Sequence, residues 1–178
     1  SFMRDTKSEF VEFRKGRLDV LAALDPSIAT AVVQADGSLQ QAFAGYTLQQ
    51  VCAQSIEYYG ILLDTLTEVG RSTPLARSRL LRQALNYAID RERIVRYVLH
   101  GKGVPAHHGV IPPGMPGYSP DVIGYSYDPE RARKLLQQAG FTGGKGLPPL
   151  TLQMGNSART VSVGEAIQQM WKEIGVDV

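Results

Sequence analysis

The apolar residues of the stretch 81–99 recur every three or four positions, which is the spacing of one face of an α-helix. Two stripes follow each other, formed by Leu81, Ala84, Leu85, Ala88 and Ile89 and then by Ile94, Val95, Val98 and Leu99. Asp90 stands between them, and a short acidic side chain is a favoured N-cap. The sequence therefore predicts two amphipathic helices that meet at Asp90, the second of which ends at Gly101.

A long irregular loop is predicted directly after these helices. Residues 102–127, the Pro/Gly loop, contain five prolines and five glycines together with the adjacent pair His107 and His108. Such a composition cannot sustain a regular helix, although it can form an ordered loop over a core. Loops of this length are usually functional or disordered, so this one requires an explanation.

The remaining segments alternate between helical and extended patterns. Helices are predicted at about 6–16, where Thr6 and Glu9 have capping-box spacing, at 27–35 after Asp25, at 130–139 after Asp128, and at 163–174. Runs rich in β-branched and aromatic residues predict strands before the first helix and at 47–53, 56–63 and 149–154. This alternation predicts an α/β fold.

Composition excludes several classes of protein. With 43% hydrophobic and 20% charged residues, the 178-residue chain is neither disordered nor fibrous. The single Cys52 excludes an internal disulfide and a thiolate zinc site. No apolar run approaches the ~20 residues that a membrane helix needs, and the first residues lack a signal-peptide pattern.

The arginines of the two central helices do not predict a nucleic-acid partner. A helix-turn-helix that presents them to phosphates is one interpretation, but the net charge of the chain is only +2. The helices also abut at Asp90 without a turn of three or four residues, and Glu92 dilutes the positive charge. A solvated arginine face explains the pattern better, so no nucleic acid is expected as a partner.

Enzymatic and cofactor motifs are missing from the sequence. It contains no Gly-x-Ser-x-Gly and no His-Glu-x-x-His, and the glycine-rich stretch 139–146 follows a helix, whereas a phosphate-binding loop follows a strand. Neither catalysis nor a cofactor is therefore expected. His107 and His108 are adjacent and point different ways, so a metal site with His100 requires a convergence that their spacing does not provide.

Four motifs occur in order along the central region: RQALNYAIDR at 82–91, GVPA at 103–106, IPPGM at 111–115 and YDPERA at 127–132. In this combination they resemble the central region of the extracytoplasmic solute-binding proteins of ABC importers, peptide/nickel-binding class (family 5). Weaker similarity lies at 13–21, 58–64 and 164–178. The sequence departs from the family at Leu63-Asp64, where Phe-Asn is usual, and at Met154, where peptide-binding relatives often place a ligand contact.

The resemblance implies a periplasmic-binding-protein-like fold of type II. Because family members are much longer, the chain is expected to be a central fragment. In it, residues 1–45 would form a strand-helix segment of the first lobe and residues 46–178 a truncated second lobe. Arg82 and Asn86 would make scaffold hydrogen bonds, and the Pro/Gly loop would cover the core.

The resemblance also implies a function. Family members capture a solute, commonly a short peptide, in a cleft between two lobes that close by a hinge, and then dock on a membrane permease. Such proteins are periplasmic or otherwise extracytoplasmic, and some are anchored by a lipid. A nickel receptor and a solute-sensing regulatory domain on the same fold are the alternatives.

Five residues are candidates for ligand contacts: Tyr58, Tyr59, Met154, Gly155 and Asn156. An exposed strand edge can pair with an extended peptide backbone, and aromatic rings pack against peptide side chains with little selectivity for their identity. A tyrosine on a central strand is more often a core residue than a ligand contact, and Gly155-Asn156 could equally form only a turn before a helix.

Overall fold

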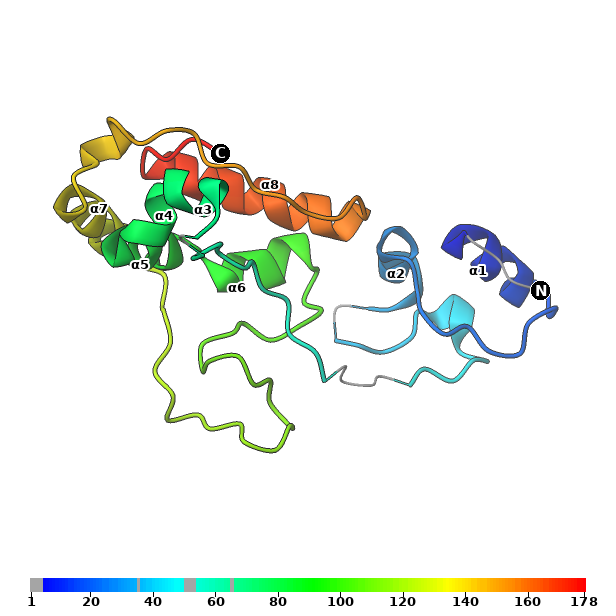
Figure 1. Cartoon of the computed structure of the whole chain (residues 1–178). Helices are drawn as coiled ribbons and strands as arrows, with labels where there is room; N and C mark the ends of the chain where they lie inside the picture. The colour runs from blue at the N-terminus through cyan, green and yellow to red at the C-terminus, as the bar shows by residue number, and fades with distance from the viewer. Residues whose placement is uncertain (1–4, 35, 50–53, 65) are drawn as a thin grey trace. The chain divides into compact units, whose positions relative to one another are not determined.

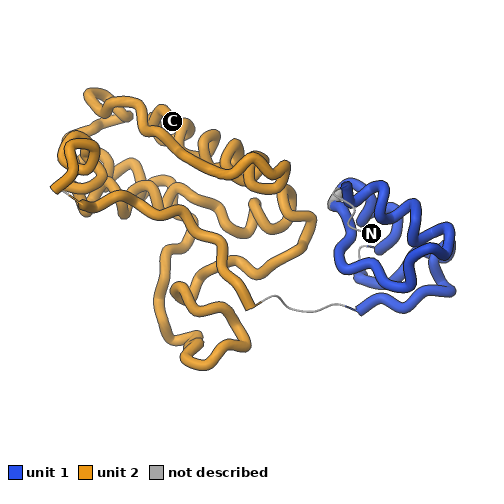
Figure 2. Tube along the Cα trace, turned by 45° about the vertical axis from the view of Figure 1, so that its right-hand side comes forward, with its two compact units in different colours: residues 1–53 blue, residues 54–178 orange. Residues whose placement is uncertain are grey.

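The computed structural model describes residues 5–34, 36–49, 54–64 and 66–178 (Figure 1). The chain divides into two compact units, residues 1–53 and residues 54–178, which we call the N-terminal and C-terminal units (Figure 2). The assignment of residues 1–45 to a first lobe and of 46–178 to a second lobe stays a prediction.

Side-chain caps determine where the helices of the N-terminal unit begin. It contains α1 (Thr6–Arg14), α2 (Pro26–Val32) and a short 3₁₀ turn, η1 (Gln41–Phe43). Asp5 caps α1, so the expected capping box at Thr6 is wrong, and the Thr6 hydroxyl donates instead to Asp25, at 2.8 Å. Asp25 also accepts from the Ser27 N–H at 2.8 Å, which caps α2 as predicted. The strand predicted before α1 lies mostly outside the described residues.

A small aromatic cluster holds the N-terminal unit together. Phe43 is buried, and its ring centroid lies 6.0 Å from that of Phe10 and 6.1 Å from that of Tyr46. The Arg14 guanidinium lies 5.5 Å from the centroid of the Phe43 ring and adds a cation–π contact. Among the described residues, the buried side chains of this unit are Ala29 and Val32 from α2 and Phe43 from η1, and Phe10 of α1 lies against Phe43.

The C-terminal unit is mainly helical (Figure 1). Its elements are α3 (Glu68–Ser72), α4 (Pro74–Arg77), α5 (Arg79–Tyr87), α6 (Arg91–Arg93), the π-helical turn η2 (Ile94–Val98), α7 (Pro129–Gln138), the 3₁₀ turn η3 (Thr142–Gly144) and α8 (Ala158–Glu173). Asp90 and Asp128 cap α6 and α7, which confirms both predicted helix starts. The last helix begins earlier than the predicted residue 163, because Ser157 accepts from the Thr160 N–H and caps it.

The core of the C-terminal unit is formed by the apolar faces of three helices. Its buried members include Leu81, Ala84 and Leu85 from α5, Ala132 and Leu136 from α7, Ile167, Met170 and Trp171 from α8, and the fully buried Val176 after α8. The buried Trp171 indole N–H donates to the Leu85 carbonyl oxygen at 3.0 Å, which connects α8 to α5. No helix in the described parts of the chain combines the length and hydropathy that crossing a membrane requires.

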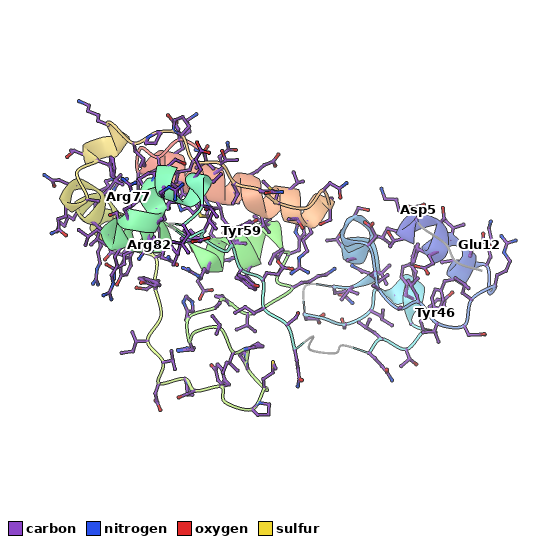
Figure 3. The ribbon with its side chains drawn as sticks, in the orientation of Figure 1. Asp5, Glu12, Tyr46, Tyr59, Arg77 and Arg82 are labelled. Atoms are coloured by element: carbon purple, nitrogen blue, oxygen red, sulfur yellow. The ribbon has the colours of Figure 1, made fainter. Side chains whose placement is uncertain are left out.

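Polar residues of the RQALNYAIDR motif form a hydrogen-bonded scaffold. Arg82, labelled in Figure 3, donates from Nη1 to the carbonyl oxygen of Leu75 at 2.6 Å, and Asn86 donates to the carbonyl oxygen of Arg82 at 2.9 Å. Arg91 donates to the Asn86 side chain at 3.2 Å and to the Tyr125 carbonyl oxygen at 3.4 Å, and burial lowers the pKa of Arg91. The scaffold role predicted for Arg82 and Asn86 is confirmed.

The segments predicted as strands at 56–63 and 149–154 are not paired with a partner strand among the described residues. Within the described ranges the only ladder contact is an isolated antiparallel bridge between Val33 and Leu39. Segments 56–63 and 149–154 run extended or irregular, and a single backbone bond from the Leu150 N–H to the Asp177 carbonyl oxygen, at 2.9 Å, joins the second one to the C-terminal residues. A strand needs a partner ladder, which these segments lack here. Residues 50–53 of the strand predicted at 47–53 lie outside the described residues.

The Pro/Gly loop is irregular, as its composition predicts, but it projects away from the helices and does not cover the core (Figures 1 and 2). The Gly124 N–H donates to the His107 carbonyl oxygen at 2.9 Å and brings the two limbs of the loop together. At the far end, the Asp128 N–H donates to the Tyr87 carbonyl oxygen at 2.8 Å. The loop is therefore attached to the helices by hydrogen bonds near its ends. Its apolar side chains Val110 and Ile123 are exposed and do not pack on a core.

Titration of Asp25 tests the capping of α2. Hydrogen bonds from Ser27, and then from Thr6, lower the pKa of Asp25 from 3.8 to about 2. A depressed carboxyl pKa stabilises the folded unit above pH 3.8, and this contribution is lost as the pH falls towards 2. We expect the Ser27 amide resonance to titrate with a midpoint near 2, and Asp25→Asn to abolish this step. A midpoint at 3.8 in the wild type would contradict the capping geometry.

Truncation of Leu136 tests the packing of α7. Leu136 is fully buried, so Leu136→Ala is expected to lower the free energy of unfolding by about 2–5 kcal/mol in urea unfolding experiments. The matched control is Leu66→Ala, since Leu66 is 85% exposed, and this change should stay within about 0.5 kcal/mol. Equal losses in the two variants would show that α7 does not bury Leu136.

Candidate functional site

Two segments that lie far apart in the sequence meet beside α8. The chain before α8 runs along that helix before entering it, as Figures 1 and 2 both show. Near the start of α8, Arg159 pairs with Glu57, with 2.9 Å between Nη2 and Oε1. The structure thereby brings segment 55–63, which carries Tyr58 and Tyr59, to the helix that follows segment 151–156.

Gly164 is a buried glycine of α8, and the side chains of two predicted site residues, Met154 and Tyr59, lie close to it. A Cβ atom at this position would lie 2.5 Å from both Sδ and Cε of Met154, and 3.7 Å from the phenol oxygen of Tyr59. The thioether of Met154 thus occupies the space that any larger residue at 164 would fill. Tyr59 and Met154 are therefore neighbours on the same patch of α8.

The two tyrosines lie in different environments. Tyr58 is 78% exposed, whereas Tyr59 (Figure 3) is partly buried and packs against the hydrophobic core of the C-terminal unit. Burial raises the pKa of Tyr59, and the negative charge of Glu57 adds to this effect. Tyr58 thus offers a free ring at the surface, while Tyr59 anchors the segment beneath it.

Gly155 and Asn156 lie at the exposed end of segment 151–156, directly before the N-cap Ser157. A side chain at Gly155 would meet nothing within 4 Å. Within the described residues, the backbone groups of 55–63 and 151–156 form no hydrogen bonds to other parts of the chain. The main-chain donors and acceptors of both segments are therefore not paired with other parts of the described chain.

The three histidines do not form a common site. His107 Nε2 lies 3.1 Å from Glu92 Oε1, and His108 Nδ1 lies 3.2 Å from the Val122 carbonyl oxygen. The two rings are nearly perpendicular, with centroids 6.3 Å apart. Across the part of the chain that the structure describes, no group of three His, Cys, Asp or Glu residues is placed to hold a metal ion. The convergence that a nickel site requires is not found among these residues.

Sequence reasoning missed the residues of α8 that organise this region. Gly164 and Arg159 lie before or at the edge of the predicted helix 163–174, and Glu57 has no motif around it. Gly164 itself was the available signal in the sequence. A glycine inside an amphipathic helix lowers the stability of the helix, so its presence usually indicates that another group packs closely against the backbone there.

Alkaline titration tests the burial of Tyr59. A raised phenol pKa stabilises the fold below pH 10.0, and this contribution is lost as the pH rises through the higher pKa of the folded state. We expect Tyr59→Phe to reduce the steepness with which the free energy of unfolding falls above pH 10.0, as measured by urea unfolding. Tyr58→Phe, which removes an exposed phenol, is the matched control. Identical alkaline profiles of Tyr59→Phe and the wild type would contradict the burial.

Two curated relatives resemble part of the chain. The dipeptide-binding protein of Escherichia coli (strain K12) is 39% identical over 98 residues, and the oligopeptide-binding protein OppA of Bacillus subtilis (strain 168) is 33% identical over 105 residues. These alignments cover 54% and 55% of this chain but only 18% and 19% of the relatives. The chain therefore spans a small part of proteins of this kind.

The fold is similar to that of a solved binding protein. The periplasmic oligopeptide-binding protein of an oligopeptide ABC transporter from Thermotoga maritima matches with a TM-score of 0.64 and 23% identity, over 99% of this chain and 34% of that chain. At this level of identity the match establishes the fold alone. The family described as "Bacterial extracellular solute-binding proteins, family 5 Middle" matches residues 1–178. The chain belongs to the bacterial extracellular solute-binding proteins of family 5.

Proposed function

We propose that the chain is part of the solute-binding component of an ABC-type importer, which captures oligopeptides or a related small solute outside the cytoplasm. In this proposal the fold is of type II, and the C-terminal unit contributes one wall of a cleft between two lobes. The loaded protein then delivers its solute to a membrane permease. Membership of the family and the peptide-binding relatives support this function.

The ligand surface in this proposal comprises Tyr58, Tyr59, Met154, Gly155 and Asn156. The observation that carries it is that the backbone of segments 55–63 and 151–156, beside an exposed tyrosine ring, forms no hydrogen bonds to other described residues. An extended peptide laid along such backbone forms main-chain hydrogen bonds that do not depend on its sequence, each worth about 0.5–1.5 kcal/mol net. A receptor of varied peptides needs this kind of recognition.

The side chains add affinity with little selectivity. The Tyr58 ring is free to pack against a peptide side chain, and Met154, a flexible residue that is 37% exposed, adapts to apolar groups of different shape. Closure of the two lobes is driven by ligand binding. A peptide that binds the closed form more tightly than the open form shifts the population towards the closed form. No corresponding observation favours the nickel alternative, because His107 and His108 each contact a separate partner.

A thermal-shift experiment tests the function. The probe is a defined mixture of unmodified di- to pentapeptides added to the full-length protein that carries this sequence. Ligand at about 100 times its Kd stabilises the folded state by about 2.7 kcal/mol, so the melting temperature should rise with peptides. A rise with Ni²⁺ and none with peptides would overturn the proposal in favour of a metal receptor.

Tyr58→Ala tests the location of the ligand. This change should weaken the apparent affinity for the peptide mixture about tenfold, which corresponds to about 1.4 kcal/mol, without changing the melting temperature of the free protein. Tyr97→Ala is the matched control, because Tyr97 is 65% exposed on η2 and lies outside the proposed surface. Equal affinities of the Tyr58 variant and the control would place the ligand elsewhere.

A further inference from the structure

Segment 55–63 has few attachments to the rest of the C-terminal unit. No backbone hydrogen bond holds it to other described residues. Two side-chain contacts connect it to α8, in addition to the packing of Tyr59 against the core. One is the ion pair between Glu57 and Arg159, and the other is the approach of Tyr59 to Gly164. The position of Tyr58 relative to Met154 therefore depends on these contacts with α8.

We infer that Gly164 and the Glu57–Arg159 pair are positioning residues. They fix the Tyr58-Tyr59 segment and the Met154–Asn156 segment relative to each other, so that the two segments form one ligand surface. This inference rests on the proposed function and extends it to residues that touch no ligand. It assigns to α8 the role of a common support for two chain segments that are distant in sequence.

Gly164 acts through the side chain of Met154. A Cβ at 2.5 Å from Sδ and Cε is too close for any real contact, so one of the groups has to move. Because these atoms are the far end of a flexible side chain, Met154 moves while the helix stays in place. Alanine is also a better helix former than glycine, so Gly164→Ala leaves α8 folded and displaces the thioether.

The ion pair acts through the position of segment 55–63. Arg159 and Glu57 have side chains that are 49% and 64% exposed, and ion pairs as exposed as this contribute little to the free energy of unfolding. Such an ion pair can still favour one position of segment 55–63, because this segment forms no backbone hydrogen bonds to other described residues. Its loss is therefore expected to change ligand affinity and leave stability nearly unchanged.

Gly164→Ala in the full-length protein, with ¹³C-labelled methionine methyl groups, tests the first contact. We expect the Met154 methyl resonance to shift and the apparent affinity for the peptide mixture to fall about tenfold, while the melting temperature of the free protein does not fall. Gly45→Ala is the matched control, because a Cβ at Gly45 meets nothing within 4 Å. A shifted resonance with unchanged affinity, or a resonance that does not shift, would overturn the role of Gly164.

Charge reversal tests the second contact. Arg159→Glu should weaken peptide binding, and the double change Arg159→Glu with Glu57→Arg should restore it, because the pair is rebuilt with opposite polarity. The pair of Arg93 and Glu173, with side chains 56% and 39% exposed, provides the control reversal. Failure of the double variant to recover affinity would overturn the role of the pair.

The methyl resonance separates the two proposals. If the wild type binds no peptide, the proposed function fails, while the response of the Met154 methyl group to Gly164→Ala still reports whether Gly164 positions that side chain. If the wild type binds peptide and neither set of variants changes the affinity, the proposed function stands and the positioning role fails.

Discussion

The docking of α8 on the core is the interaction on which the rest of the C-terminal unit depends. Trp171 buries its indole and donates to the Leu85 carbonyl oxygen, while the Asp90 N–H lies 3.4 Å from the thioether sulfur of Met170. These contacts connect α8 to α5 and to the start of α6. Since a buried N–H without an acceptor is costly, the Trp171 bond fixes the rotation of α8 as well as its position. That rotation determines which face of α8 Gly164 and Arg159 occupy.

The helices could be predicted from the sequence because their signals are local. Asp25, Asp90 and Asp128 each precede an apolar stripe and each accepts a hydrogen bond from a backbone N–H in the first turn. The strand predictions have no such local support, because a strand depends on a partner that is distant in sequence. Segment 149–154 has strand composition, yet among the described residues a single backbone hydrogen bond, from Leu150 to Asp177, joins it to another segment.

The candidate site illustrates the same limit. Tyr58 and Tyr59 were both predicted to contact a ligand, and the structure places them in different environments, with Tyr58 exposed and Tyr59 packed against the core. No local pattern indicated that Met154 would lie on Gly164, because that contact depends on the course of the chain along α8. The most recognisable motif identifies the family through scaffold residues, as Arg82, Asn86 and Arg91 bond to each other and to backbone carbonyls.

The central claim is that α8 brings the Met154 side chain onto the bare backbone of Gly164. A nuclear Overhauser effect between the Met154 methyl protons and the Gly164 α protons, measured in the full-length protein without ligand, tests this most directly. The contact geometry, with Cε 2.5 Å from the Cβ position of Gly164, predicts a strong effect. Its absence, together with a Met154 methyl group that contacts only solvent, would contradict the account.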